Sequence, residues 1–523
     1  MIALAALVAL LPLAGALAVL VRPRARAAGW ALVAGSAGAF ASSLVMLARV
    51  VHSGHFSALE GFVYVDSLSA FFAATVSFVV LLASLGSAAY LRTEEDRGVL
   101  SSFQVRLYFV FFSIFASGML ASFLAGNLGL LWVLIEASTL ASAVLVGLEG
   151  KGTSLEAAWK YVIVSSFGVT VALLGTVFLF YSASALHLGA TQGLTWVFLF
   201  DRARRLAPAS LRLAFLLAVV GYGTKVGLVP MHTWLPDAHS EAPSPASAML
   251  SAGLLNTGMY AIIRFRAIAV AGIGGVYPGN VLLVFGFASV FVGVIFMVRR
   301  GNFKRMFAYS SIEHMGIISV ALGFGGILGM YGALLQTLNH AIGKSVLFLS
   351  SGYLVLGYHT RESTKVRGVL QALPLAGAAL LLASFAVAGS PPFGVFLSEL
   401  TIVRSGFAGG APVLAGLLLV LLAIGFVALF GAALSMAAGE RSAVERSAGE
   451  RSAGELPAGA GPAGEGPAGE GPAAGAFVAY PLRSSRVLAG APLVAGLAAL
   501  GILGLWIPAG LNTVIMHSIR AMA

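Results

Sequence analysis

Residues 411–438 read APVLAGLLLVLLAIGFVALFGAALSMAA, a run without a single charged side chain. Because a helix needs roughly 20 apolar residues to cross a bilayer, this stretch predicts a membrane-spanning helix. Similar runs recur along the 523 residues, of which 59% are hydrophobic and only 10% are charged, whereas about a quarter are charged in soluble proteins. The composition predicts an all-α polytopic membrane protein. It excludes a soluble enzyme, a disordered chain and, despite a net charge of +11, a nucleic-acid-binding module.

About fourteen stretches are long and apolar enough to span a membrane. They lie at about 2–21, 29–50, 62–91, 108–125, 127–147, 157–182, 211–230, 244–271, 278–298, 303–323, 326–357, 373–404, 411–438 and 486–508. The first stretch lacks the basic start of a signal peptide, so we expect it to be retained as a helix.

The basic residues indicate how the chain is oriented. With the N-terminus outside and the loops alternating, 20 of the 31 basic residues lie in inner loops and 9 lie in outer ones. Inner loops of membrane proteins carry such an excess of Lys and Arg. We therefore expect an even number of spans in the cytoplasmic (inner) membrane, with both termini outside.

One segment is not expected to be membrane. Residues 440–473 consist of five-residue repeats such as ERSAG and PAGEG and hold 6 of the 20 acidic residues. Segments of this composition cannot bury a core. We expect a disordered cytoplasmic linker, with a docking tail for a partner as the alternative.

Among the ionisable side chains inside expected spans, four stand out: Glu136, Lys225, Lys344 and Glu399. Each costs about 2.5–3.5 kcal/mol at the centre of a membrane helix, so each is a functional candidate. Lys344 follows His340 by four residues, which places both on one helix face. The alternative for each group is a buried ion pair that only holds helices together. Several such groups at similar depth favour a chain that exchanges protons.

Two spans contain prolines that predict broken helices. Pro230 follows Lys225 by five residues, and Pro391 and Pro392 precede Glu399. Proline removes a backbone donor, and an interrupted helix is tolerated in a membrane only where it lines protein or a wet cavity. Breaks at corresponding places in spans 7 and 12 indicate two inverted repeats of five helices.

This pattern divides the chain into five parts. We expect N-terminal helices 1–3 in residues 1–107, a first inverted repeat in 108–271, a second in 278–438, the low-complexity loop in 439–476, and helix 14 with a tail in 477–523.

Other polar residues carry weaker signals. His314, beside Glu313 in YSSIEHMGII, is either a proton relay or a packed histidine. Asp237, His239 and Glu241 in WLPDAHSEAPSP resemble a metal cluster, but a proline-stiffened turn capped by the aspartate is favoured. The sequence has no Cys, which excludes disulfides, thiolate-bound zinc and cysteine-bound iron–sulfur clusters. We expect no catalytic residue, metal or cofactor in this chain.

The stretch KVGLVPMHTWLPDAHSEAPSPASAML (225–250), with Glu136 upstream and LNHAIGKSVLFLSSG downstream, resembles the antiporter-like membrane subunits of complex I, multisubunit cation/proton antiporters and membrane-bound hydrogenases. The resemblance covers about residues 60–440. YSSIEHMG and AGSPPFGVFLSELTI are most similar to hydrogenase-4 component F.

This resemblance implies fourteen helices, with breaks in helices 7 and 12, and a role for each polar residue. Glu136 and Lys225 become the charge pair of a first half-channel. Central relay groups are His314, His340 and Lys344, and Glu399 ends the second half-channel. Asn256 departs from the pattern, because many relatives have a lysine there; its amide cannot take or release a proton, although it can hold a water.

The resulting functional hypothesis is a proton-translocating, or sodium-linked, subunit of an ion-pumping membrane oxidoreductase of the group 4 hydrogenase or formate hydrogenlyase type. Expected partners are other membrane subunits, including antiporter-like ones, peripheral nickel–iron hydrogenase and iron–sulfur subunits, and lipid, but no nucleic acid. The alternatives are a subunit of a cation/proton antiporter or of a complex I, and a non-conducting scaffold for a hydrogenase or carbon dioxide-hydrating module.

Overall fold

The computed structural model describes residues 1–21, 25–184, 190–299, 301–439 and 486–522. The repeats expected to be disordered, residues 440–473, lie outside the described residues.

The first third of the chain is helical apart from one short hairpin. Its elements are α1 (Ile2–Leu10), η1 (Leu11–Leu13), α2 (Ala14–Val21), α3 (Ala25–Ser53), β1 (Phe56–Ala58), η2 (Leu59–Gly61), β2 (Val63–Val65), α4 (Ser67–Asp96), α5 (Ser102–Ser122), α6 (Leu128–Val146) and α7 (Gly152–Ser184). Strands β1 and β2 pair antiparallel, with Ser57 opposite Tyr64.

The middle of the chain alternates long helices with short ones. Its elements are α8 (Ala190–Leu194), α9 (Trp196–Asp201), η3 (Ala203–Arg205), α10 (Pro208–Val226), α11 (Leu235–Glu241), α12 (Ser244–Met249), the π-helical segment η4 (Leu250–Leu254), α13 (Leu255–Ile273), α14 (Val276–Val298), α15 (Phe303–Phe324) and α16 (Gly326–Tyr358).

The remaining elements include the second expected break. They are α17 (Val369–Ala372), α18 (Pro374–Val387), α19 (Gly394–Ala408), α20 (Pro412–Ala438), α22 (Arg486–Leu505) and α23 (Ala509–Arg520).

The described helices confirm a polytopic membrane protein. Eleven of them are long and apolar enough to cross a membrane, or up to twelve when α22 and α23, bent by 79° at their junction, count as one span. Helical segments occupy all fourteen expected stretches. However, α15 carries several charges, and the stretch 373–404 is divided between α18 and α19. The exact count of fourteen spans therefore stays a prediction.

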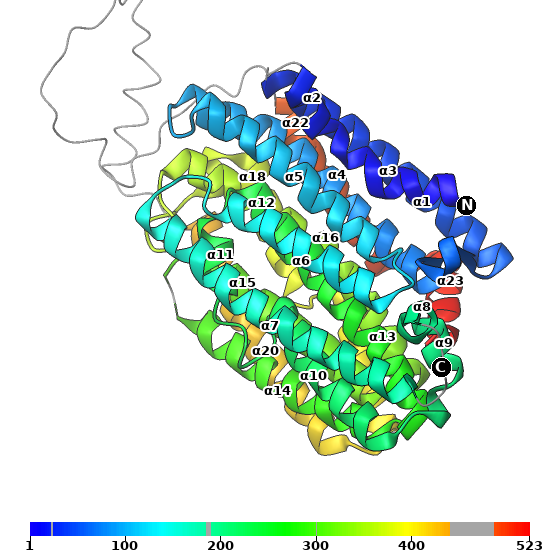
Figure 1. The fold of residues 1–523 in the computed structure, drawn as a ribbon. Coiled ribbons are helices and arrows are strands. Elements are labelled where there is room, and N and C mark those ends of the chain that lie inside the picture. Colours follow the sequence, from blue (N-terminus) through cyan, green and yellow to red (C-terminus); the bar gives the residue numbers. More distant parts are fainter. Residues whose placement is uncertain (22–24, 185–189, 300, 440–485, 523) are drawn as a thin grey trace, which may run out of the picture.

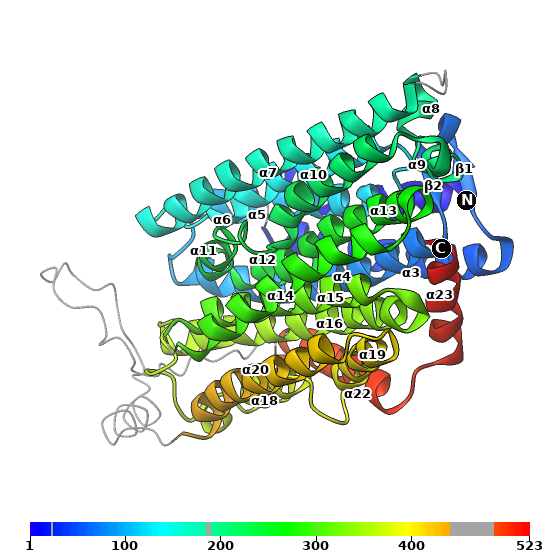
Figure 2. The same cartoon turned by 90° about the horizontal axis from the view of Figure 1, so that it is seen from below.

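The long helices run side by side along one direction (Figures 1 and 2). In Figure 1, α1–α3 form one edge of the bundle and α14 and α20 form the opposite edge. Helix α16 lies between them and packs against α4, α12, α15, α18, α19 and α22. The N-terminus, the hairpin and α23 share one end of the bundle, as an even number of spans requires (Figure 2).

Polar residues in the loops start several of these helices. Asp66 accepts a hydrogen bond from the Ser69 amide at the start of α4, and Asn127 accepts from two amides of α6. Asn302 does the same for α15, and Ser101 forms a capping box with Gln104 at α5. Such side chains satisfy amides that have no partner within the helix. They define where each apolar run begins as a helix.

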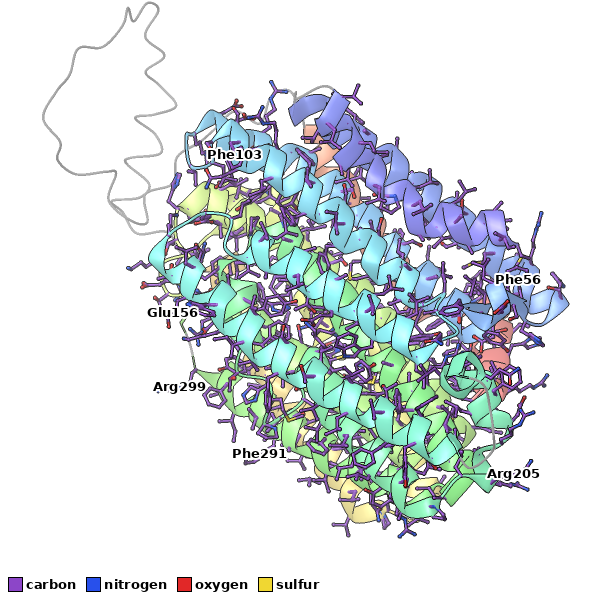
Figure 3. All side chains as sticks on the ribbon, in the orientation of Figure 1. Phe56, Phe103, Glu156, Arg205, Phe291 and Arg299 are labelled. Carbon is purple, nitrogen blue, oxygen red and sulfur yellow. The ribbon has the colours of Figure 1, made fainter. Side chains whose placement is uncertain are left out.

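The charged residues labelled in Figure 3 lie at the two ends of the bundle. Glu156 and Arg299 lie at one end, and Arg205 lies at the other. Phe291 lies between the ends and is 54% exposed on the outer surface of α14. This distribution is expected of a protein whose flank faces lipid.

Candidate functional site

The first break interrupts the helix that carries Lys225. Helix α10 ends at Val226, and Gly227 follows with a φ of 78°, in the left-handed region that favours glycine. The Val229–Pro230 bond is cis, and the helix resumes as α11 at Leu235. The indole Nε1 of Trp234 donates to the carbonyl of Thr224 at 2.7 Å, which satisfies one backbone group freed by the break. The break expected at Pro230 is confirmed.

The second break has the same design. Helix α18 ends at Val387, Gly389 has a φ of 79°, and Pro391–Pro392 is a cis bond before α19 begins at Gly394. The break expected at these prolines is also confirmed. Gly504 of α22 lies directly on it, since a Cβ there would be 1.7 Å from the Pro392 carbonyl oxygen.

Lys225 is fully buried in the last turn of α10, and its Nζ has no hydrogen-bond partner among the described residues. The ammonium lies over the ring of Tyr161, 5.0 Å from its centroid, in a cation–π contact. Glu136, on α6, instead accepts a hydrogen bond from Ser166 at 2.6 Å through Oε1, while Oε2 has no partner. Among the described residues, neither Lys225 Nζ nor Glu136 Oε2 has a hydrogen-bond partner, so the two groups are not in direct contact. Tyr161 occupies the position next to the ammonium.

Asn256 follows a π-helical segment in a fully buried position. Its Nδ2 donates to the Ala252 carbonyl at 2.7 Å, and its Oδ1 has no partner in the described structure. The π-helix η4 directly precedes it, and such irregular turns occur often at functional sites. An unpartnered buried amide oxygen is a position at which proteins bind an internal water.

His314 connects α15 to both halves of the second broken helix. Its Nε2 donates to the Val387 carbonyl at 3.0 Å, the last residue of α18, and its Nδ1 accepts from Nε2 of Gln336 at 3.0 Å. Oε1 of Gln336 accepts a hydrogen bond from Ser398 of α19. A carbonyl oxygen only accepts, so the His314 proton is on Nε2 and the ring is neutral in this arrangement.

His340 and Lys344 lie one turn apart on α16, as their spacing predicts. The His340 Nε2 donates to the Ser251 carbonyl of η4 at 3.3 Å, and its Nδ1 has no partner in the described part of the chain. The ring centroid of His340 is 5.2 Å from that of His314. Lys344 donates to the Phe307 carbonyl at 3.1 Å and to the Ser310 hydroxyl at 2.7 Å. The three central groups are therefore neighbours in one layer.

Glu399 lies just past the second break and is 8% exposed. A Cβ on Gly389 would lie 2.1 Å from its Oε2, so the glycine at the break leaves room for the carboxyl group. The seven expected residues thus lie on α6, α10, α13, α15, α16 and α19, with His340 and Lys344 both on α16.

Most of this architecture matches known proteins. Residues 125–425 match the family described as NADH:quinone oxidoreductase/Mrp antiporter, TM. A hydrogenase-4 component F homolog from Methylacidiphilum infernorum is 39% identical over 372 residues, which are 71% of this chain and 77% of the relative. The chain belongs to this antiporter family. The resemblance expected from the sequence, including that to hydrogenase-4 component F, is confirmed.

Two solved structures share the fold along nearly the whole chain. A chain of the Mrp complex from Dietzia sp. DQ12-45-1b has a TM-score of 0.78 at 20% identity and covers 100% of this chain and 97% of its own. A chain of respiratory complex I from Thermus thermophilus with bound NADH has a TM-score of 0.75 at 22% identity, covering 99% and 100%. At these identities the likeness concerns the fold of the family.

Two buried polar residues near the central groups were not among the seven residues expected from the sequence. Gln336 precedes His340 by four residues, so the helical spacing that joins His340 to Lys344 also identifies it. Glu313 is only 5% exposed. It is an acid inside the expected span 303–323, the same signal that singled out Glu136.

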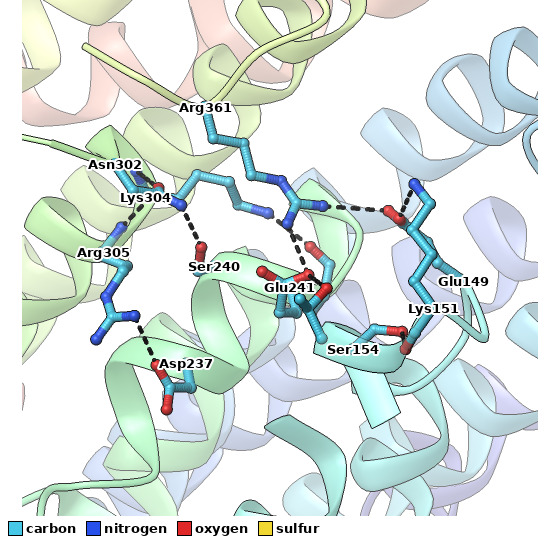
Figure 4. A network of polar contacts seen from close by, with 12 residues as sticks. Glu149, Lys151, Ser154, Asp237, Ser240, Glu241, Asn302, Lys304, Arg305 and Arg361 are labelled. Atoms are coloured by element: carbon cyan, nitrogen blue, oxygen red, sulfur yellow. Dashed lines mark hydrogen bonds and ion pairs between the residues drawn. The ribbon is translucent and has the colours of Figure 1, made fainter. Parts of the chain in front are cut away.

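A network of charges closes one end of the bundle (Figure 4). Arg361, after α16, contacts Glu241 of α11 at 2.8 Å and Glu149, between α6 and α7, at 3.3 Å. Buried Lys304 of α15 donates to the Ala242 carbonyl at 2.6 Å. Of these residues, Glu149 and Arg361 lie in loops, which the expected alternation of spans assigns to the inner side.

Burial alone raises the pKa of Glu241, but the hydrogen bond and the positive charge of Arg361 hold it below its usual range. The pKa of Arg361 is raised, because the contacts with Glu241 and Glu149 outweigh its burial. The Glu241–Arg361 contact therefore stabilises the fold at neutral pH, and this stabilisation is lost as the pH falls through the lowered pKa of Glu241.

Asp237, His239 and Glu241, which resemble a metal cluster in the sequence, do not form one in the described structure. Asp237 does not cap a turn, since it forms ion pairs with Lys160 at 3.4 Å and Arg305 at 2.9 Å. Glu241 contacts Arg361, whereas His239 is fully buried against Phe348 of α16. Within the described ranges no group of three ligands could hold a metal ion.

The opposite end of the bundle holds a buried ion pair. Arg264 of α13 contacts both carboxylate oxygens of Asp66, at 2.6 and 2.8 Å, and its guanidinium lies between the rings of Trp196 and Tyr260. The basic-residue count places Arg264 and Arg266 in an outer loop, which is wrong, because both are buried within α13. Their ion pair and hydrogen bonds make this burial possible.

Proposed function

We propose that this chain is the proton-translocating, antiporter-like subunit of an ion-pumping membrane oxidoreductase, of the group 4 hydrogenase or formate hydrogenlyase type. The proposal is carried by the buried polar side chains of α6, α10, α13 and α16, which we propose form a row. Among them, Lys225 Nζ, Glu136 Oε2, Asn256 Oδ1 and His340 Nδ1 have no partner within the described residues. Buried polar atoms without a protein partner bind water, so this row provides sites for a proton path.

The two breaks support an internal repeat. We assign residues 108–271 to a first inverted repeat and 278–438 to a second, each holding one broken helix. The end of the bundle with the Arg361 network is the cytoplasmic one in this proposal, which leaves both termini outside and the 439–476 loop inside. Residues 1–107 and 477–523 flank the repeats.

Lys225 is the proposed switch of the first repeat. Its ammonium has the Tyr161 ring as a neighbour but no carboxylate within 4.0 Å. Movement of Glu136 into contact stabilises the charged lysine by about 4 kcal/mol at an effective dielectric near 20. Its withdrawal releases the proton toward His340, Lys344 and Glu399. Redox chemistry in partner subunits drives the movement.

The name of the Methylacidiphilum relative supports hydrogenase partners. We propose further antiporter-like subunits and peripheral nickel–iron hydrogenase and iron–sulfur subunits as partners. Identification of the subunits that co-purify with this chain from native membranes tests the assignment. A nickel–iron large subunit is expected; antiporter subunits alone contradict it and favour the cation/proton antiporter, and a carbon dioxide-hydrating module favours the scaffold.

Asn256→Lys is expected to change the pH dependence of turnover. Gly258, two residues further along α13, lies against the Cβ of Lys225, so α13 packs on α10 at this level and the substitution adds a second cation to the proposed path. Like charges disfavour each other's protonation. The measurement is turnover and proton translocation of the reconstituted complex across pH, with Asn256→Leu as the uncharged control. An unchanged pH profile with lowered thermal stability rejects a proton path at this position and favours the scaffold function.

A further inference from the structure

We propose that Glu313 is a further proton carrier, which connects Lys344 to Glu399 in the second repeat. The inference rests on the proposed function, proton translocation, and adds a group that lies outside the seven expected residues. The inference is based on the position of the Glu313 carboxyl group among helices α15, α16, α19 and α20.

The Glu313 carboxyl group is buried without a partner that offsets the cost of its burial among the described residues. It lies on α15 and is 5% exposed, and neither a hydrogen bond nor an ion pair within 4.0 Å involves its carboxyl group in the described part of the chain. The buried ion pair of Asp66 with Arg264, by contrast, shows how this fold satisfies a structural carboxylate. A buried acid without such a partner is costly to keep. A purely structural role does not account for it.

The neighbours of Glu313 are the two groups that it has to connect. Lys344 of α16 donates to Ser310, one turn before Glu313 on α15, so its ammonium lies against the same helix. The Glu313 carboxyl group is near enough to Lys344 and to Glu399 of α19 to interact electrostatically with both. Its neighbours therefore include a proton donor and a proton acceptor.

Gly425 of α20 creates the space for this carboxyl group. A Cβ at Gly425 would lie 2.2 Å from Oε1 of Glu313 and 3.2 Å from its Cδ. Any other residue at this position forces the carboxyl group to move. The helices packed on α15 in the described part of the chain are α11, α14, α16, α19 and α20.

Few other charges face this group. Helices α14 and α20 carry no Asp, Glu, Lys, Arg or His. Helix α16 contributes His340 and Lys344, and α19 contributes Glu399 and Arg404. Asp237, His239 and Glu241 of α11 pack toward the start of α15, where Lys304 and Arg305 lie.

The proton transfer has two steps. A proton leaves the Lys344 ammonium through a bridging water and bonds to a carboxylate oxygen of Glu313, which leaves a neutral amine and a neutral carboxylic acid. Glu313 then gives a proton to the Glu399 carboxylate and returns to its charged form. Charge and protons balance at each step, and no electron is transferred.

Glu313→Gln removes the titrating group and keeps its shape. The measurement is proton translocation per electron by the complex in liposomes, together with its pH profile and the electron-transfer rate. We expect translocation to fall by about 10²-fold, a typical contribution of one acid–base group, while electron transfer continues. Glu313→Asp keeps the acid and is expected to restore translocation with an altered pH profile.

Gly425→Ala tests the same inference without changing any titratable group. The new Cβ displaces the far end of the Glu313 side chain, which can shift at little structural cost. Gly431→Ala, on the same helix, is the matched control because nothing lies within 4 Å of its Cβ. We expect Gly425→Ala to lower translocation and Gly431→Ala to leave it unchanged.

The outcomes separate this inference from the proposed function. Loss of translocation in Lys344→Ala with wild-type translocation and pH profile in Glu313→Gln overturns the role of Glu313 alone. Wild-type translocation in Lys344→Ala overturns the proposed function. If Glu313→Gln fails to assemble, the Gly425→Ala and Gly431→Ala pair decides: equal translocation in the two overturns the inference.

Discussion

Lys225→Ala is expected to abolish proton translocation by the reconstituted complex, while electron transfer continues at a reduced rate. Lys225 is the buried cation next to the first helix break, and its Nζ makes no hydrogen bond among the described residues. Alanine therefore removes the proton-binding group and its cation–π contact with Tyr161 without breaking a hydrogen bond. The measurement is acidification of the liposome interior per electron transferred, together with the melting temperature of the complex.

Lys365→Ala provides the control for Lys225→Ala. This lysine is 48% exposed and pairs with Glu362 at the surface, where an ion pair contributes about 0–1 kcal/mol. We expect it to retain both translocation and electron transfer. Full translocation in Lys225→Ala would remove this lysine from the mechanism. Equal loss in both variants would point to a general effect of lysine removal.

Arg264→Ala is expected to cause a large loss of stability, because it leaves the buried Asp66 carboxylate without its partner. Breaking a buried ion pair in this way costs about 3–5 kcal/mol. The contacts of the guanidinium with Trp196 and Tyr260 are lost as well. The measurement is the melting temperature of the purified subunit or complex in detergent.

Two further variants show whether burial is the cause. Arg305→Ala removes an ion pair with Asp237 in which the arginine side chain is 48% exposed, so we expect a change of about 0–1 kcal/mol. The double variant Asp66→Leu with Arg264→Met removes both charges and is expected to recover much of the loss. A melting temperature of Arg264→Ala equal to that of Arg305→Ala contradicts the explanation.

Much of the fold can be predicted from short stretches of the sequence. The stretch 326–357 was expected to be a span, and α16 runs from Gly326 to Tyr358. The breaks at Pro230 and Pro391 were likewise expected, since proline fixes φ and removes a backbone donor wherever it occurs. These properties depend on a residue and its neighbours in the chain, so no knowledge of packing is needed to predict them.

The candidate site can be predicted only in part from short stretches of the sequence. The shared face of His340 and Lys344 follows from helical spacing, which also would have identified Gln336. The separation between Glu136 and Lys225 does not follow from helical spacing, because Tyr161 of a third helix lies beside the ammonium. The position of Arg264 was misjudged for the same reason, since its partner Asp66 is 198 residues away.

The sequence by itself determined the membrane class, the positions of the helices, both breaks and the family, because apolar length and backbone restriction are properties of short segments. The tertiary structure alone decided which polar groups meet. Whether Glu313 is buried and faces an acid or a lysine depends on Gly425, Lys344 and Glu399, which come from three other helices. In a membrane the free energy of a polar side chain is set by its neighbours in space, and those neighbours are brought together only by packing.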